Sequence, residues 1–182
     1  MFNRFMKWLV PKLEARLLRQ GKVRYIYGKQ SEDPENVYLR RTFLFRSKLF
    51  SIYIHRFMRS DKDEHHDHPF DFLGYIVTKG YHESVLHGKE CANGLLLTGG
   101  YYLTGKREEG TWGFRRAETK HMVMLDRPYD QTEYDQAPLT IIFRGPYRRE
   151  WGFWRGENTD EELNRWVPWW EYLNVPRSDI RE

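Results

Sequence analysis

The sequence predicts an all-β protein, an antiparallel β-barrel with a helical segment before it and a short helix near the C-terminus. Aromatic residues make up 16% of the 182 residues, and such residues are enriched in strands. Many short runs alternate apolar and polar residues, and turn residues such as Gly99-Gly100 and Glu109-Gly110 separate them. No long helical stretch divides these runs, so a parallel α/β sheet is not expected.

The first twenty residues have the spacing of an amphipathic helix. Pro11 has no amide donor, so we expect it to kink this helix or begin a second one, and Gly21 is expected to end it. Residues 1–21 are predicted to pack on the barrel. Residues 22–182 are predicted to form the barrel and its Trp-rich tail, within a single domain.

The strand-like runs follow one another closely along the chain. They are Lys22–Tyr27, Val37–Phe45, Lys48–Met58, Phe70–Thr78, Tyr81–Leu86, Leu95–Leu103, Thr111–Phe114, His121–Leu125 and Leu139–Phe143. Asp126–Pro138 is predicted to be a polar loop. A short helix is predicted from Thr159, capped by Thr159 or Asp160 and followed by the aromatic block Trp166–Leu173.

Composition narrows the expected partners and compartment. The net charge is +4, but acids and bases are interspersed, so we expect no nucleic-acid partner. No apolar run has the length of a membrane span, so we expect no membrane partner. Cys91 is the only cysteine, and this excludes an intrachain disulfide and suits a reducing cytoplasm.

A cluster of histidines is the strongest sign of chemistry. In His65-His66-Asp67-His68, strand alternation places His66 and His68 on one face and the other two residues on the opposite face. His121 begins a later strand and is the best candidate for a third ligand. Three neutral imidazoles suit a divalent transition metal, with iron the first candidate and zinc, manganese or nickel also possible.

The segments His66–Phe72 and Val77–Glu83, followed by Gly110 through His121, resemble the two motifs of the cupin superfamily. The order of these segments and of the Trp-rich blocks is similar to that in cupin-like proteins of bacteria and phages, from about Tyr38 to Leu173. The resemblance implies a cupin-type (jelly-roll) β-barrel around a metal site. It also implies a homodimer that pairs through edge strands.

The sequence departs from the cupin pattern at the position of the glutamate ligand. Asp71 stands there, and alternation turns it away from His68, so it is either a ligand or a partner of a histidine. His82 or Glu83 on the next strand could complete the site instead. A guanidinium inside the barrel would bind a carboxylate or phosphate, and Arg56, beside His55, is the main candidate, with Arg144 the weaker one.

Two kinds of function remain open at this point. The first is a metal-dependent enzyme, an oxygenase, isomerase or lyase, that acts on a small polar molecule. The second is a non-catalytic cupin that serves as a binding module. His65, Asp67 and His121 also match the HxD…H triad of iron oxygenases that use 2-oxoglutarate. An open pocket at the histidines would favour an enzyme, and a collapsed, Phe-filled interior would favour a binding module.

Overall fold

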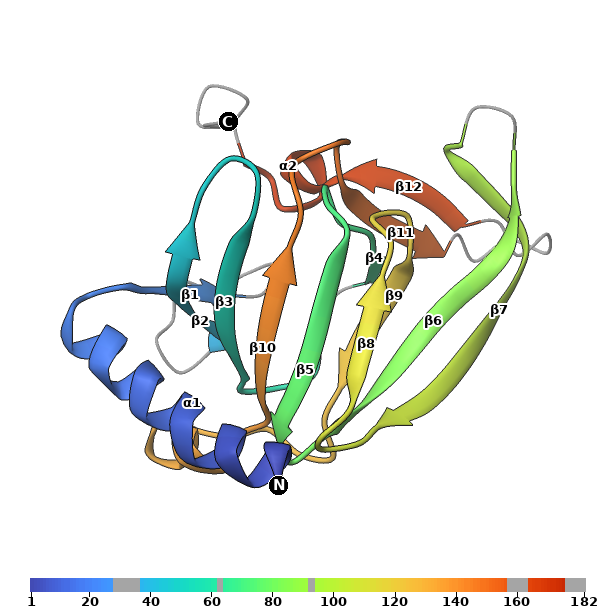
Figure 1. Cartoon of the computed structure of the whole chain (residues 1–182). Helices are drawn as coiled ribbons and strands as arrows, with labels where there is room; N and C mark the ends of the chain where they lie inside the picture. Colours follow the sequence, from blue (N-terminus) through green and yellow to red (C-terminus); the bar gives the residue numbers. More distant parts are fainter. Residues whose placement is uncertain (28–36, 62–63, 92–93, 157–163, 176–182) are drawn as a thin grey trace.

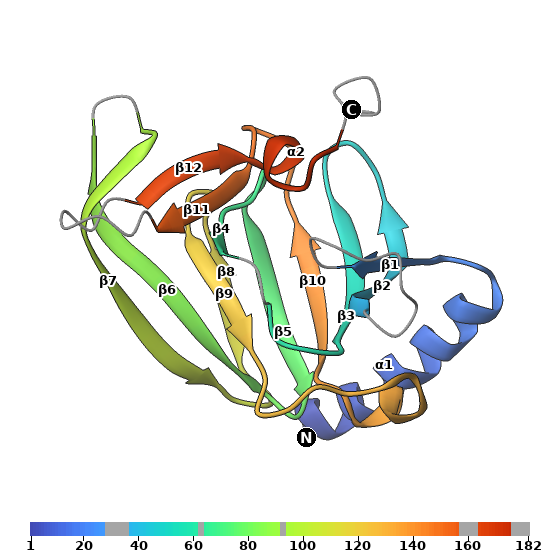
Figure 2. The same cartoon turned by 180° about the vertical axis from the view of Figure 1, so that it is seen from behind.

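The computed structural model describes residues 1–27, 37–61, 64–91, 94–156 and 164–175. These residues form an open antiparallel sheet, a closed ring of strands and a helix across the outer face of the sheet (Figures 1 and 2). The sheet has the order β1 (Val23–Tyr27), β2 (Val37–Arg46), β3 (Ser51–Phe57), β10 (Leu139–Arg144), β5 (Phe72–Thr78) and β8 (Trp112–Arg115). The ring has the order β11 (Gly152–Gly156), β12 (Asn164–Pro168), β7 (Leu96–Arg107), β6 (Tyr81–Glu90), β9 (Lys120–Met124) and β4 (His65–His66).

This arrangement confirms the predicted all-β fold, an antiparallel β-barrel with an N-terminal helix and a short C-terminal helix. Each predicted strand-like run contains a strand of the structure. The ring also uses β4, β11 and β12, which were not predicted as strands. The short helix α2 is Trp169–Tyr172, within the aromatic block, and the predicted helix start at Thr159 lies outside the described residues. The predicted loop contains a 3-10 helix, η2 (Gln131–Gln136), which begins with a capping box on Asp130.

Helix α1 (Phe2–Arg19) is one continuous helix, which corrects the expectation that Pro11 would divide it. A proline inside a helix removes one hydrogen bond, and here the packing of residues on both sides of Pro11 against the sheet keeps the two halves in line. Gly21 ends the helix as predicted. Its φ is +67°, and the amides of Gly21 and Lys22 donate to the carbonyls of Leu18 and Leu17, the pattern of a Schellman cap.

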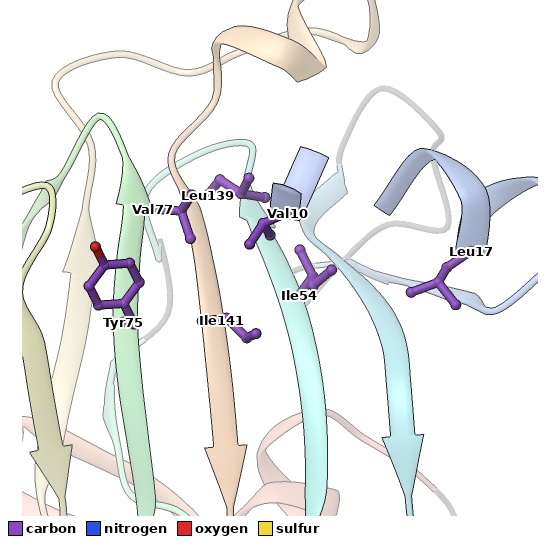
Figure 3. Packing of buried hydrophobic residues seen from close by; sticks show 7 residues of the cluster. All are labelled: Val10, Leu17, Ile54, Tyr75, Val77, Leu139 and Ile141. Atoms are coloured by element: carbon purple, nitrogen blue, oxygen red, sulfur yellow. The ribbon is translucent and has the colours of Figure 1, made fainter. Parts of the chain in front are cut away.

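The helix covers the outer face of the open sheet. Its buried residues Val10 and Leu17 meet alternate residues of three strands, so this face is a continuous apolar core (Figure 3). The strand residues are Ile54, Tyr75, Val77, Leu139 and Ile141. The residues between them in sequence face the inside of the barrel. None of the helices in the described part of the chain is both long and apolar enough to span a membrane.

A buried ion-pair network joins the helix to the same outer face. Glu14 is 1% exposed, and its carboxylate accepts hydrogen bonds from Arg40 Nη2 at 2.8 Å and from Arg56 Nε at 2.7 Å. Arg56 Nη1 also donates to the carbonyl of Tyr134, at 2.8 Å. One carboxylate therefore compensates two guanidinium groups that the helix and sheet remove from water.

Replacing Glu14 with Gln should destabilise the protein by about 3–5 kcal/mol, because two buried guanidinium groups lose their counter-ion. Urea unfolding of the wild type and of E14Q measures this difference. Lys7→Ala is the matched control, because it breaks the exposed pair of Lys7 with Glu109 and should change the stability by about 1 kcal/mol or less. An E14Q protein as stable as the wild type would contradict the structural role of this network.

Candidate metal centre

The three histidines predicted as metal ligands lie together, between the closed ring and the open sheet. The pairing of β4 with β9 places His66 directly opposite His121, and the amide of His68 donates to the carbonyl of Ala117, shortly before β9. One ring nitrogen from each histidine lies within 4.8 Å of the others. The Nε2 atoms of His68 and His121 are 2.7 Å apart. Three imidazoles from two distant segments therefore point at one small volume.

Strand alternation divides the histidine segment between two faces, as the sequence indicated. His65 faces away from the other histidines, and its Nε2 lies 2.9 Å from Ser84 Oγ. Asp67 is buried among tryptophans on that opposite face. The structure therefore does not assemble the alternative HxD…H triad of His65, Asp67 and His121.

The Asp67 carboxylate is fully buried, and both of its oxygens accept hydrogen bonds. Oδ1 accepts from the Gly152 amide at 2.8 Å, and Oδ2 accepts from the indoles of Trp154 at 3.3 Å and Trp166 at 3.1 Å. Burial raises the pKa of Asp67, and the nearby Arg149 and these hydrogen bonds oppose the rise. A cavity of about 320 Å³ lies on this face and has no lining residue among the three histidines.

A carboxylate lies close to a ring nitrogen in two of the histidines, and it forms a hydrogen bond only in His121. Glu83 Oε1 lies 2.7 Å from His121 Nδ1, and Asp61 Oδ2 lies 3.0 Å from His66 Nδ1. Burial raises the pKa of Glu83, but hydrogen bonds from His121 and Arg115 lower it more strongly, to about 2. An ionised Glu83 can only accept, so the proton of a neutral His121 lies on Nδ1 and its Nε2 lone pair faces the other histidines.

Burial keeps two of these imidazoles uncharged. Burial lowers the pKa of His68 well below 6.5, and electrostatic interactions with His121, His66 and Arg41 lower it further. It also lowers the pKa of His121, although the hydrogen bond to Glu83 acts in the opposite direction. Neutral imidazoles at neutral pH are the form that binds a metal ion.

Aromatic rings surround the three histidines. The Phe72 ring lies 5.0 Å from that of His68, and the rings of Phe153 and Trp151 lie 5.6 and 6.4 Å from that of His66. The cavity between His121 and the open sheet has a volume of only about 20 Å³. The interior beside the histidines is therefore narrow and largely filled by side chains.

Two of the other candidate residues lie outside the histidine cluster. Asp71 Oδ1 accepts from the Ala117 amide at 2.7 Å, so Asp71 supports the loop that bonds to His68 and is not a ligand in this arrangement. The exposed His82 lies 3.7 Å from Asp126. Glu83 alone among the candidates on its strand reaches the cluster.

The arginine expected inside the barrel is a different one. Arg56 lies on the outer face with Glu14, because it is one residue out of phase with His55. The inner face carries Arg41, which pairs in register with His55, and Arg144, whose Nε donates to Tyr53 Oη at 3.1 Å. Alternation within β2 shows that Arg40 and Arg41 lie on opposite faces of the strand. Only the register with β3 shows that Arg41 is the one on the inner face.

The donor set fits a divalent transition metal. Metal–nitrogen bonds of about 2.0–2.1 Å place two nitrogens bound to one ion roughly 3–4 Å apart. The separations observed here, from 2.7 Å to at most 4.8 Å, bracket that value. Imidazole ligands suit iron, zinc, nickel and copper, and the described residues include no further His, Cys, Asp or Glu in this group.

No family model matches this chain, and neither does any curated protein. Solved structures do match. The DMSP lyase DddQ from Ruegeria pomeroyi is 14% identical with a TM-score of 0.46, and the match covers 72% of this chain and 59% of the lyase, less than two thirds of its length. An RmlC-like cupin from Shewanella frigidimarina is 13% identical with a TM-score of 0.42, covering 69% of this chain and 87% of that one.

A cupin 2 conserved barrel domain protein from Rhodopseudomonas palustris is also 13% identical, with a TM-score of 0.46, and the match covers 73% of this chain and 78% of that protein. Two of these structures are described as cupins and one as a lyase. Similarities this low assign neither a family nor an activity to this chain. The description of this chain as an antiparallel β-barrel rests on its own strand pairing.

Replacing Glu83 with Gln should weaken zinc binding by about 10- to 100-fold, because Gln no longer holds the Nδ1 proton of His121 with a negative charge. Competition with a chelating dye measures this affinity. Glu109→Gln, which changes the same charge at the exposed pair with Lys7, should bind zinc as the wild type does. Equal affinities of E83Q and wild type would show that Glu83 does not orient the histidine.

A second prediction concerns pH and the buried His55, whose pKa lies well below 6.5 because of burial and the charge of Arg41. The unfolded chain binds a proton at this residue near pH 6.5 and the folded protein does not, so stability falls as the pH drops below 6.5. The loss is about 1.4 kcal/mol per pH unit down to the folded pKa. The decrease in unfolding free energy from pH 7 to pH 5, measured by urea unfolding of metal-free protein, should be smaller in His55→Gln.

The exposed His87 provides the control for this measurement. Its replacement by Gln should leave the decrease between pH 7 and pH 5 as large as in the wild type. If the H55Q protein loses as much stability as the wild type, His55 is not held neutral in the fold.

Proposed function

We propose that this chain binds one divalent transition metal ion through His66, His68 and His121. The observation that supports this most is the convergence of three ring nitrogens within 4.8 Å. The carboxylate of Glu83 is hydrogen-bonded to Nδ1 of His121, an arrangement that fixes the tautomer and orientation of a metal-binding histidine. Iron is the first candidate, and zinc, manganese and nickel accept the same ligands.

We further propose that the metal serves catalysis on a small polar molecule, in an oxygenase, isomerase or lyase reaction. A metal ion held by three imidazoles keeps positions open for water or substrate, and acts there as a Lewis acid or in dioxygen chemistry. The surrounding residues of this chain hold the imidazoles in place. Arg115 and Arg107 keep Glu83 ionised, and the aromatic rings of Phe72, Phe153 and Trp151 limit the access of water.

The narrow interior favours a second candidate, a cupin that binds metal without catalysis. The cavity beside His121 has room for about one water molecule at 20 Å³, whereas pockets for small molecules occupy about 300–1,000 Å³. A catalytic role therefore requires the inner face to open when substrate binds. Crystallography of the metal-loaded protein distinguishes the two, because the enzyme should show an enlarged cavity next to the ion and the binding module should not.

Purified protein should contain close to one metal ion per chain by elemental analysis, and His66→Ala and His121→Ala should lose nearly all of it, since two remaining imidazoles bind an ion far more weakly. His87→Ala removes a histidine that stacks on Tyr101, remote from the site, and should retain the metal. Wild-type protein that contains no metal after purification, and takes none up from solution, would refute the proposal.

A further inference from the structure

The inner face of the open sheet carries a row of three polar residues across neighbouring strands. Arg41 of β2 pairs in register with His55 of β3, and His55 pairs in register with Thr140 of β10. We name Arg41, His55 and Thr140 the polar row. Thr140 lines the same small cavity as His121. The Thr140 end of the polar row therefore lies beside the histidine cluster.

Arg41 is a guanidinium without a counter-ion in the described part of the chain. Its Nε donates to His55 Nε2 at 2.9 Å and its planar group lies 5.0 Å from the Tyr53 ring. Among the described residues no ion pair involves Arg41, and no hydrogen bond involves its Nη1 or Nη2 atom. Arg41 is partly exposed, and these two atoms are not among the buried unsatisfied ones, so solvent reaches them. Arg41 on the inner face therefore keeps a forked pair of donors accessible to an oxyanion from solvent.

Other arginines of the described residues have more partners than Arg41. Arg40 and Arg56 share Glu14 on the outer face, and Arg107 and Arg115 share Glu83 inside the barrel. The buried Arg144 donates to Tyr53 Oη and to the carbonyls of Gly145 and Ser47. Arg41 differs from these five because it pairs with neither a carboxylate nor a backbone carbonyl of the described residues.

Thr140 supplies a second unpartnered group. The residue is 1% exposed, and its Oγ1 makes no hydrogen bond although it lies beside the cavity that His121 lines. Buried hydroxyl groups nearly always have a partner, so an orphaned one marks a place where water or a ligand atom belongs. Thr140 pairs in register with His55 of the polar row and lines the cavity that His121 also lines.

The charges inside the barrel also favour an anion. Arg41, Arg144, Arg107 and Arg115 face the interior, and Glu83 neutralises only part of their charge. Asp61 is the carboxylate next to His66. A divalent ion at the histidines would add two more positive charges, so the interior would attract negatively charged molecules.

We propose that the polar row binds the anionic end of the molecule on which the metal site acts, a carboxylate or a phosphoryl group. Arg41 donates to two oxygens of this group through Nη1 and Nη2, the forked geometry that suits both kinds of oxyanion. Thr140 donates to an oxygen nearer the histidines. Anion binding itself does not depend on the proposed function, but the position of the rest of the substrate at the metal does.

The test is a titration of the full chain with inorganic phosphate and, separately, with acetate at constant ionic strength. Binding is followed by ¹H–¹⁵N NMR at the Arg41 backbone and Nε signals, in metal-free and in zinc-loaded protein. The wild type should show saturable shifts with at least one anion. Tighter binding of phosphate identifies a phosphoryl group as the ligand, and tighter binding of acetate identifies a carboxylate.

Arg41→Gln should weaken this binding by about tenfold or more, because the forked donor and its charge are lost. Arg46→Gln is the matched control, since the exposed Arg46 lies on the same strand and the charge change is the same. The affinity of the R46Q protein for the anion should be within about twofold of that of the wild type, because salt screens the effect of remote exposed charges. Arg41→Lys keeps the charge without the fork, so it should fall between the two and serves if R41Q does not fold.

The proposal is overturned if neither anion gives saturable shifts, or if R41Q or R41K binds as the wild type does, or if R41Q and R46Q weaken binding equally. Metal content measured on the same samples separates this result from the proposed function. Anion binding in a protein that takes up no metal refutes the metal site alone. A metal-binding protein without anion binding refutes the polar row alone.

Discussion

The buried carboxylate of Asp67 is the interaction on which the arrangement of the metal centre depends. It lies in sequence between two of the three candidate ligands, and it binds the amide of Gly152 and the indoles of the C-terminal hairpin. A side chain at Gly152 would come within 2.2 Å of the Val167 carbonyl, so only glycine allows the two strands and Asp67 to approach this closely. The closed ring is thus joined to the histidine segment through Asp67, whose two carboxylate oxygens both accept hydrogen bonds.

A single geometric rule, the alternation of side chains along a strand, assigns separate tasks to the two faces of the open sheet. On β2 and β3, Arg40 and Arg56 bind Glu14 of the helix, while Arg41 and His55, one residue away, face the barrel interior. The outer face is stabilised by apolar packing and a compensated ion network. The inner face keeps polar groups uncompensated, which costs stability and is typical of functional surfaces.

The sequence allowed the β-barrel and the grouping of His66, His68 and His121 to be predicted, and the reason is local. Alternation within four residues separates His66 and His68 from His65 and Asp67 without any knowledge of other strands. The choice of Arg56 failed because the face of a strand depends on its register with partners distant in sequence. Strand register is also the reason why Glu83 could not be distinguished from the other candidates Asp71 and His82 in the sequence. Asp61 was not predicted because its contact with His66 depends on a loop conformation.

The Trp-rich C-terminal region shows a similar limit. Aromatic content indicated burial, but the pairing of β11 with β12 and with β4 leaves no alternating pattern in the sequence, since the consecutive residues Gly152, Phe153 and Trp154 of β11 are all buried.

Asp67 accepts a hydrogen bond from Trp166, which lies 99 positions later in the chain. This separation affects when the histidine segment can fold during synthesis. β4 has only two residues and cannot fix the histidine segment by itself. During synthesis the segment emerges long before the strands that hold it, and closing so long a loop is entropically costly and slow. The candidate metal centre is therefore completed only after translation has passed β12, and uptake of the proposed metal would report on a chain that has folded this far.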